Sequence, residues 1–423
     1  MQKVVLSPSR LKGSVNVPPS KSIAHRAIIS ACLARGKSRI FNADFSQDIL
    51  ATIDAVKALG ARVETEKNEI IIDATDMFSV ENAVINCRES GSTLRFMLSV
   101  AAVGGGNTTF NGEGRLPKRT IAELLKLFES HSVKSSVKDG LPVTISGKLT
   151  GGLFEISGDI SSQFITGLMF ALPLCSEDST IKLTTKLESK GYIDITISVL
   201  ADFGIEIQPT NDGWFIRGNQ TYKPNDYTIE ADWSQAAFYM GAGLIGSELR
   251  LKGLNKNSSQ GDMAGLEVFR RFGADISWDG DVLLCKPSKR KGIEVDAKQI
   301  PDLVPIIAAC SALCEGKTVI YGAKRLKLKE SDRLFSMADG LQKLGVDAQQ
   351  TDDGIIIYGA EKIKSADIKG YNDHRIVMAF SVLSLCAEGE VTIDDAQSIN
   401  KSYPDFFNDY NSLGGKADVI NLG

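Results

Sequence analysis

Basic residues recur at the starts of predicted helices in this sequence. Lys21 and Arg26 lie in PPSKSIAHR (18–26), where apolar spacing predicts a helix that begins near residue 21. A helix N-terminus already carries the positive end of the peptide dipole, so these cations are mildly unfavourable there unless an anion binds beside them. Other basic clusters precede or begin predicted helices in RLPKR (115–119), KLESKGY (186–192), KRLKLKESDR (324–333), YNDHR (371–375) and NKSYPD (400–405). The set suits a ligand with more than one phosphate or carboxylate group.

Two acidic residues accompany these cations. Glu330 and Lys329 precede Arg333 by three and four residues, a spacing that predicts one shared helical face. Asp302 follows a proline at another predicted helix start. A carboxylate held among cations can transfer a proton beside a charged substrate. The plainer alternatives are a surface ion-pair ladder, solvated basic loops and ordinary helix caps.

Composition excludes several other kinds of chemistry. The formal net charge is −4, which argues against a general nucleic-acid binder. Seven cysteines form no CxxC pair, and there are only three histidines, so a disulfide framework, a structural zinc site and a His-centred triad are not expected. The sequence has no GxxxxGK[ST], no HExxH and no convincing dinucleotide-binding fingerprint. Transfer chemistry on small phosphorylated or carboxylated molecules remains.

The compartment is indicated by what the sequence lacks. The N-terminal segment MQKVVLSPSR has no apolar signal core, and no apolar run reaches the ~18 residues of a membrane span. The cysteines, including Cys310 and Cys314 inside an apolar run, are expected to be buried core thiols. We therefore expect a cytoplasmic protein without a membrane partner.

One pattern recurs six times at intervals of about 70 residues. Each copy has an amphipathic helix that ends at a small residue, followed by two short strands around a polar turn. The marker residues are Gly60, Ser130, Gly204, Gly273, Gly345 and Gly414, and the last copy is shortened. A second predicted helix precedes each copy and is apolar on nearly all faces, which is typical of a buried helix.

These repeats predict an α/β (α+β) protein of six units with buried helices, each unit reading as helix, strand, helix, strand, strand. A solenoid is one interpretation, but a single-layer array does not easily bury such helices. Two clusters of three units fit the 423 residues better, with a midpoint near 227–232. The six helix starts could then converge on one anion site.

Seven motifs resemble the 5-enolpyruvylshikimate-3-phosphate synthase family of enolpyruvyl transferases. They span residues 18 to about 407 in the order PSKSIAHR, SGSTLR, SSQFITGLM, ESKGYIDIT, LKLKESDRL, YNDHR and NKSYPDFF. The resemblance implies a pseudo-symmetric enolpyruvyl transferase fold of six βαβαββ units, three in each of two domains. The N-terminal domain (21–230) would lie mainly on the shikimate 3-phosphate side. The resemblance also implies a C-terminal domain (1–20 plus 231–423), mainly on the phosphoenolpyruvate side, and an active site in the cleft between the two domains.

The resemblance further implies a reaction. The enolpyruvyl group of phosphoenolpyruvate would pass to the 5-hydroxyl of shikimate 3-phosphate through a tetrahedral intermediate, with release of phosphate. This is a step towards chorismate and the aromatic amino acids. The family needs no metal and no organic cofactor. The expected partners are the two small substrates alone, and the expected assembly is a monomer.

Roles for individual residues follow from the matched motifs only. Asp302 would deprotonate the attacking hydroxyl, Glu330 would be the acid and base at the methylene carbon, and Lys21 would reach both substrates. The residues implied to bind shikimate 3-phosphate are Lys21, Ser22, Arg26, Ser161, Ser162, Gln163, Ser189, Tyr192, Asp302 and Lys329. Those implied to bind phosphoenolpyruvate are Lys21, Gly91, Arg119, Gln163, Arg333, Arg375 and Lys401.

Some positions depart from the family pattern, and two alternatives compete with it. Glu89, Ser92 and Gly191 stand where well-known members have Asn, Thr and Pro, which leaves open how tightly a phosphonate inhibitor binds. The main alternative is UDP-N-acetylglucosamine enolpyruvyl transferase, whose usual members carry a Cys in the loop that reads EGRLPKR (113–119) here. A non-catalytic anion-binding protein on the same repeats is the other.

Overall fold

Two parts of the chain build separate units in the computed structural model, which describes all residues from Met1 to Gly423. One unit is Pro19–Glu230, called here the 19–230 unit. The other combines Met1–Pro18 with Ala231–Gly423 and is called the 231–423 unit. The chain passes from one to the other at residues 18–19 and again at 230–231.

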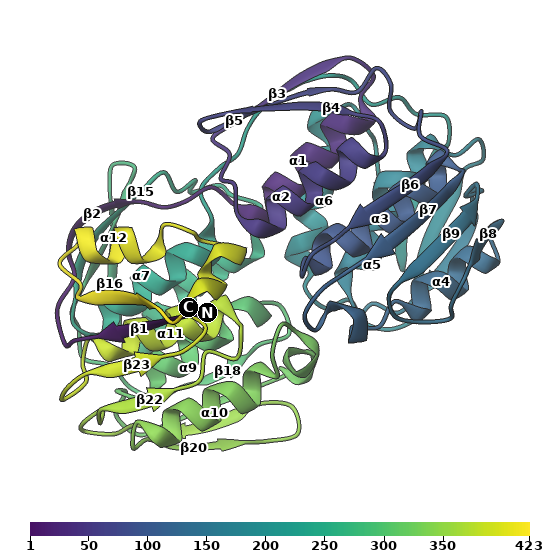
Figure 1. Cartoon of the computed structure of the whole chain (residues 1–423). Coiled ribbons are helices and arrows are strands. Elements are labelled where there is room, and N and C mark those ends of the chain that lie inside the picture. The colour runs from purple at the N-terminus through teal and green to yellow at the C-terminus, as the bar shows by residue number, and fades with distance from the viewer. The chain divides into compact units, whose positions relative to one another are not determined.

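The 19–230 unit contains six α-helices and three four-stranded sheets (Figure 1). Its elements are α1 (Lys21–Leu33), β3 (Lys37–Phe41), α2 (Gln47–Ala58), β4 (Arg62–Glu66), β5 (Glu69–Asp73), β6 (Asn82–Asn86), α3 (Gly91–Gly104), β7 (Asn107–Asn111), η1 (Leu116–Lys118), α4 (Ala122–Glu129), β8 (Val133–Ser135), β9 (Val143–Gly147), β10 (Gly152–Ile156), α5 (Ser162–Ala171), η2 (Leu172–Leu174), β11 (Ser179–Leu183), α6 (Lys190–Asp202), β12 (Gln208–Pro209), β13 (Gly213–Ile216) and β14 (Asp226–Thr228).

The 231–423 unit has the same kinds of element, and its first two strands come from the N-terminal segment. Its elements are β1 (Gln2–Leu6), β2 (Lys12–Asn16), α7 (Trp233–Ile245), β15 (Glu248–Lys252), η3 (Gly261–Ala264), α8 (Gly265–Phe272), β16 (Asp275–Asp279), β17 (Val282–Lys286), β18 (Glu294–Asp296), η4 (Pro301–Leu303), α9 (Val304–Ser311), β19 (Lys317–Tyr321), η5 (Lys324–Leu328), α10 (Arg333–Lys343), β20 (Asp347–Gln350), β21 (Ile355–Tyr358), β22 (Ala366–Ile368), α11 (His374–Ser384), β23 (Val391–Ile393), η6 (Ala396–Lys401), α12 (Phe406–Ser412) and β24 (Ala417–Asn421).

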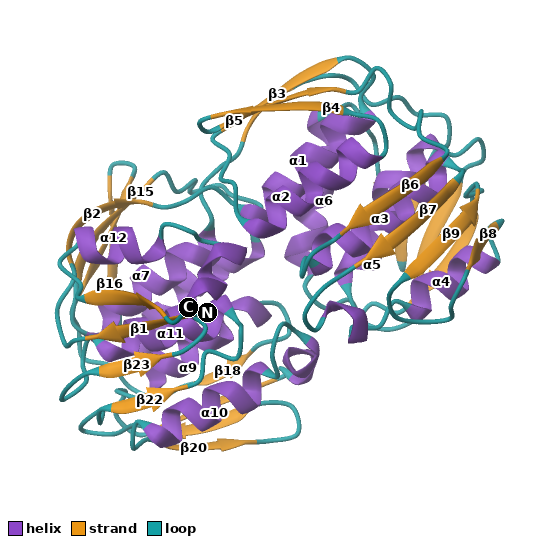
Figure 2. Cartoon of the chain, viewed as in Figure 1, coloured by secondary structure: helices purple, strands orange, loops and turns teal.

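All six sheets share one strand order, which confirms the six predicted βαβαββ units. In the sheet β6-β7-β9-β8, the first two strands are parallel and α3 connects them, whereas β9 runs antiparallel to both of its neighbours. A parallel pair needs a crossover connection, and a buried helix provides it here. Within each unit, the sheets lie outside the buried helices (Figure 2).

The shortened sixth copy is completed by the other end of the chain. Its sheet has the order β22-β23-β1-β24, so β1 occupies the position that the copy's own last strand holds in a full unit such as β6-β7-β9-β8. β1 pairs antiparallel with β23 and with β24. Similarly, β2 supplies the first strand of the sheet β16-β17-β15-β2, where it pairs parallel with β15. The sequence repeat predicted the shortened copy but not the strand that completes it.

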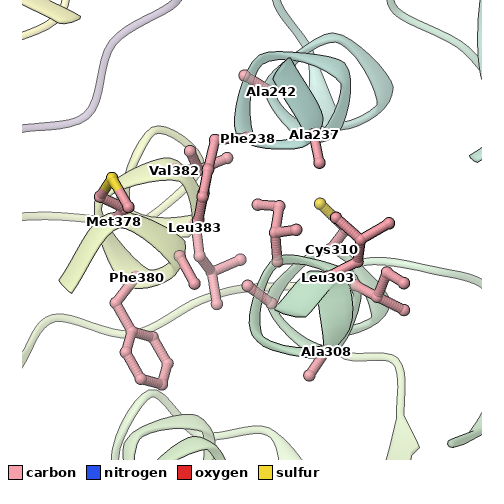
Figure 3. Close-up of a cluster of buried hydrophobic side chains, with 14 of the residues drawn as sticks. Ala237, Phe238, Ala242, Leu303, Ala308, Cys310, Met378, Phe380, Val382 and Leu383 are labelled. Carbon is pink, nitrogen blue, oxygen red and sulfur yellow. The ribbon is translucent and has the colours of Figure 1, made fainter. Parts of the chain in front are cut away.

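The buried helices form the core of each unit. In α1, α3, α5, α7, α9 and α11, nearly every residue beyond the first turn is buried. Figure 3 shows side chains of α7, α9 and α11, including Phe238, Cys310 and Leu383, gathered between these three helices. No helix of the chain combines the length and the apolar character needed to cross a lipid bilayer.

Candidate active site

Side chains cap the starts of five of the six buried helices, all except α9. Ser20, Ser90 and Ser161 accept hydrogen bonds from backbone N–H groups in the first turns of α1, α3 and α5. Asp232 and Asp373 do the same for α7 and α11. None of the six buried helices has an acidic residue in its first turn. The cap satisfies only some of the exposed N–H groups, so each start keeps the partial positive charge that favours an anion.

Lys21 is the first residue of α1 and is paired with a carboxylate of the next helix. Its Nζ atom lies 2.7 Å from Oδ2 of Asp48, and both side chains are largely buried. The backbone carbonyl of Asp48 accepts a hydrogen bond from Thr93 Oγ1 at 3.4 Å. Thr93 belongs to α3, so this contact ties the partner of Lys21 to the start of a second buried helix. Sequence reasoning did not identify Asp48, because nothing in FSQDIL marks it as the partner of a lysine 27 residues away.

Arg26 is almost completely buried and is held by neutral oxygen atoms. Its guanidinium donates to the carbonyls of Ser22 and Tyr192, at 2.6 and 2.9 Å, and to Thr196 Oγ1 at 2.8 Å. It also lies over the ring of Phe96. Burial lowers the pKa of Arg26 to about 10, so the side chain remains charged at neutral pH.

Gln163 connects the starts of α3 and α5. Its Nε2 donates to Ser92 Oγ at 2.9 Å, and its Oε1 accepts from Arg95 Nη1 at 2.7 Å. Arg95 lies in the SGSTLR motif but was given no role from the sequence. The sequence feature that could have identified Arg95 is a cation within a predicted apolar helix, because a buried cation requires a partner.

The positions of Gly91 and Ser189 each depend on backbone geometry. A Cβ atom added to Gly91 would lie 2.8 Å from the guanidinium of Arg119, so a glycine permits this close approach. Ser189 precedes α6 and has a φ of 56°, a left-handed conformation that costs a non-glycine residue about 1 kcal/mol or more. Ser162 is buried at the start of α5 beside its capping residue Ser161.

Arg333 is the centre of the corresponding cluster in the 231–423 unit. Its side chain is 2% exposed, and its three guanidinium nitrogens lie 2.8–2.9 Å from carboxylate oxygens of Asp302, Glu330 and Asp373. Burial alone would lower the pKa of Arg333, but these three carboxylates together raise it above its usual value. The sequence marked Asp373 only as part of a helix cap, whereas it also accepts from Ser331 Oγ at 2.9 Å.

Asp302 lies among three cations. Its Oδ1 is 2.9 Å from Arg333 Nη1 and 3.4 Å from Lys329 Nζ, and its Oδ2 is 3.5 Å from Arg375 Nη2. Arg375 also donates to the backbone carbonyl of Asp302 at 2.9 Å. Cations around a carboxylate favour its charged form, which is the form needed to accept a proton.

Asp262 is a further buried carboxyl of this cluster and was not predicted. Burial raises its pKa to about 7, and the nearby carboxylate of Asp302 acts in the same direction, against a lowering effect of Arg375. It lies in η3, next to Gln260, whose side chain binds the backbone at the start of α7.

The shared helical face predicted for residues 329–333 is wrong. α10 begins at Arg333, because Asp332 caps it by accepting from the N–H of Phe335 at 3.1 Å. Lys329 ends η5 in an extended conformation, and Glu330 lies in the loop between the two helices. The Glu330–Arg333 ion pair forms nevertheless, at 2.8 Å, because the loop folds back onto the start of α10.

The predicted site residues thus fall into one set in each unit. The 19–230 unit contains Lys21, Ser22, Arg26, Gly91, Arg119, Ser161, Ser162, Gln163, Ser189 and Tyr192. The 231–423 unit contains Asp302, Lys329, Glu330, Arg333, Arg375 and Lys401. Lys401 Nζ donates to the carbonyl of Asn372 at 2.6 Å, which places it at the segment before α11.

Comparison with known proteins identifies a family. The family model described as EPSP synthase (3-phosphoshikimate 1-carboxyvinyltransferase) matches residues 5–410. The chain is 44% identical over 419 residues to the 3-phosphoshikimate 1-carboxyvinyltransferase of Clostridium perfringens, covering 98% of this chain and 99% of that protein. It is 42% identical to the enzyme of the same name from Clostridium novyi, with each chain fully covered. A solved structure of EPSP synthase from Acinetobacter baumannii matches with a TM-score of 0.84 at 25% identity, again with each chain fully covered.

Proposed function

The chain belongs to the EPSP synthase family, and from this premise we propose that it transfers the enolpyruvyl group of phosphoenolpyruvate to the 5-hydroxyl of shikimate 3-phosphate. The products are 5-enolpyruvylshikimate 3-phosphate and inorganic phosphate. The observation that carries the proposal is the cluster in which Asp302 and Glu330 share the guanidinium of Arg333. The chemistry needs one proton acceptor and one proton donor beside an anion, and this cluster supplies both.

The proposed addition step uses both carboxyl groups. Asp302 accepts the proton of the attacking hydroxyl while the oxygen bonds to C2 of phosphoenolpyruvate. Glu330, in its protonated form, gives a proton to C3. The product is a tetrahedral adduct that still carries its phosphate group. Arg333 pairs with both carboxyls, and Lys329 and Arg375 lie beside Asp302, so these cations stabilise the charge that develops there.

The proposed elimination step reverses the role of Glu330. Its carboxylate removes a proton from the new methyl group, the C2–C3 double bond forms again, and the C–O bond to phosphate breaks. A group that is acid in one step and base in the next must exchange its proton readily at the working pH. A largely buried carboxyl, whose partner Arg333 is also bound by two other carboxylates, is suited to this task.

The 19–230 unit would supply most of the binding site for shikimate 3-phosphate. We assign its phosphate to Ser161, Ser162 and Ser189, and its ring to Arg26 and Tyr192. Ser22 contacts the same ligand, and Lys21 and Gln163 reach both substrates. Gly91 and Arg119 in this unit, with Arg333, Arg375 and Lys401 in the other, bind phosphoenolpyruvate. Asp302 and Lys329 of the 231–423 unit also contact shikimate 3-phosphate in this proposal, so each substrate is held by residues from both units.

The cellular compartment and the oligomeric state are also proposed. All seven cysteines are free, which is compatible with the reducing cytoplasm that we propose as the compartment. We propose a monomer that acts on two small anionic substrates, in the shikimate pathway to chorismate and the aromatic amino acids.

The decisive test is a two-substrate phosphate assay on the purified protein. We expect phosphate release only when phosphoenolpyruvate and shikimate 3-phosphate are both present. Release with UDP-N-acetylglucosamine in place of shikimate 3-phosphate would assign the other enolpyruvyl transfer instead. No release with either acceptor would favour a non-catalytic binding protein.

A further inference from the structure

The two residues that follow Lys401 are hydrogen-bonded to one face of α7. Gln235 Nε2 donates to Ser402 Oγ at 2.7 Å, and the hydroxyls of Tyr239 and Tyr403 lie 2.8 Å apart. Gln235 and Tyr239 are four residues apart and therefore share a helical face. All four side chains are buried, at 1–5% exposure, so water does not compete for these bonds.

Tyr403 is fixed further by its other neighbours. Its hydroxyl donates to Asp409 Oδ2 at 2.6 Å, so the hydroxyl of Tyr239 must be the donor in the bond between the two tyrosines. The ring of Tyr403 packs edge-on against Phe406 with 5.7 Å between ring centroids. This residue therefore cannot slide along α7 without breaking several contacts.

Lys401 depends on this anchored segment for its position. Its side chain is largely buried, and its ammonium donates to the carbonyl of Asn372, directly before the residue that caps α11. A lysine side chain is a long flexible stem that loses much rotamer freedom when it is held in one place. The backbone at 401–403 must be fixed against α7 for the ammonium to stay at the start of α11.

We propose that Gln235 and Tyr239 are positioning residues that hold Lys401 ready for the anion of phosphoenolpyruvate. The identity of that anion rests on the function proposed above. The positioning itself rests only on the contacts within the 231–423 unit. On this proposal, α7 contributes to the affinity for phosphoenolpyruvate indirectly, because its side chains fix the backbone that carries Lys401.

The kinetic test removes the Gln235–Ser402 bond from each side in the full-length protein. Gln235→Met keeps the side-chain length but has no donor, Ser402→Ala has no acceptor, and Ser402→Thr keeps the hydroxyl. Tyr410→Phe is the matched control, because its buried hydroxyl donates to the backbone carbonyl of Ser381 at 3.2 Å, in the same unit.

We expect Gln235→Met and Ser402→Ala each to raise the KM for phosphoenolpyruvate about tenfold, the effect of losing one buried hydrogen bond. The KM for shikimate 3-phosphate should change less than about twofold. Combining the two changes should add little, since both remove the same bond. Ser402→Thr and Tyr410→Phe should resemble the unchanged protein. A rise in both KM values, or an equal effect of Tyr410→Phe, would show a merely structural role and overturn the proposal.

A second measurement does not depend on catalysis. Acetylation of the substrate-free protein with a water-soluble N-hydroxysuccinimide ester, followed by peptide mass spectrometry, reports the reactivity of Lys401. We expect it to rise several-fold in Gln235→Met and Ser402→Ala but not in Tyr410→Phe. An unchanged rate in both variants would overturn the positioning role. If the unchanged protein releases no phosphate, the proposed function fails, but the acetylation result still decides the positioning.

Discussion

Both units bury an arginine near a helix start, but different groups hold it. In the 19–230 unit, Arg26 is bound by two backbone carbonyls and two threonine hydroxyls, with no carboxylate among its hydrogen-bond partners. In the 231–423 unit, Arg333 is bound by Asp302, Glu330 and Asp373. The pKa of Arg26 is lowered by burial, whereas that of Arg333 is raised by the three carboxylates despite burial.

The groups that hold each arginine suit it to a different task, either anion binding or the control of proton transfer. A buried cation held only by neutral oxygens keeps its full charge for a ligand, and an anion that binds beside it recovers part of the desolvation cost. A cation shared by several carboxylates is already compensated, and it instead controls which carboxylate carries a proton. We therefore interpret the 19–230 unit as mainly a receptor for anions and the 231–423 unit as the place of proton transfer. In the 19–230 unit, Lys21 departs from this pattern because it is paired with Asp48.

The largest effect is expected from Glu330→Gln. The amide keeps the shape of the side chain but cannot exchange a proton, so turnover should fall by about 10²–10⁴-fold. The KM for shikimate 3-phosphate should stay within about threefold, because Glu330 is not part of the anion receptor. The phosphate assay measures both, and Glu388→Gln, which removes an exposed partner of Lys362, is the control. Undiminished turnover would remove the acid–base role.

Arg26→Gln should give the opposite pattern. Loss of a buried charge beside a phosphorylated ligand should raise the KM for shikimate 3-phosphate about thirtyfold, with a smaller change in turnover. Arg39→Gln removes an arginine that forms an exposed ion pair with Glu69 and should change neither value. Thermal unfolding of both variants separates lost packing from lost affinity. A fall in turnover at an unchanged KM would contradict the interpretation that Arg26 serves anion binding.

Asp262→Asn tests the carboxylate-rich cluster through pH. The pKa of Asp262 in the folded protein is about 7, above that of an unfolded aspartate, so the folded state binds the extra proton between these values. Its contribution to stability is therefore fully present at low pH and is lost as the pH rises towards 7, with a slope of at most about 1.4 kcal/mol per pH unit. Asp302, Arg375 and Asp232 are the charged groups that act on it.

Urea unfolding at pH 5 and pH 8 measures this dependence. At each pH, the free energy of unfolding of the asparagine variant is compared with that of the unchanged protein. The difference should favour the variant more at pH 8 than at pH 5, since the variant has no charge to bury. Asp279→Asn, which removes an exposed partner of Arg250, should show no such difference. Parallel pH curves for the Asp262 variant and the unchanged protein would contradict the predicted shift.

Gly91→Ala should have the smallest effect. The new methyl group would meet the end of the Arg119 side chain, which can move away, so we expect about a fivefold rise in the KM for phosphoenolpyruvate and little change for shikimate 3-phosphate. In an Arg119→Ala background, the same substitution should have almost no effect, because the group that it displaces is gone. An equal rise in the KM for phosphoenolpyruvate in both backgrounds would show that contact with Arg119 is not the cause.

Local sequence signals predicted most of the fold. The spacing of Leu334, Met337 and Leu341 identifies α10, and Gly345 just beyond it marks the stop that recurs in the other units. The place of β1 in its sheet could not be predicted in the same way, because its partners β23 and β24 lie almost the whole sequence away from it. No local pattern records which distant strand completes a sheet.

The site was predictable in its motifs but not in its pairings. The motifs contain Lys21 and Arg333, yet Asp48 and Asp373 were not recognised as their partners, since each contact joins different helices. The extended backbone at Lys329 was missed because one capping aspartate at position 332 outweighed the charge spacing that suggested a helix.

The strand β1 has a consequence for how the protein is made. It leaves the ribosome long before its two partners, which lie at residues 391–393 and 417–421. The 19–230 unit holds all of its strands within one continuous segment and can fold during synthesis. Residues 2–6 can pair with neither strand until residues 391–421 have been synthesised. The contact between these distant segments extends beyond the strands, because the N–H of Leu422 bonds to the carbonyl of Met1 at 2.9 Å.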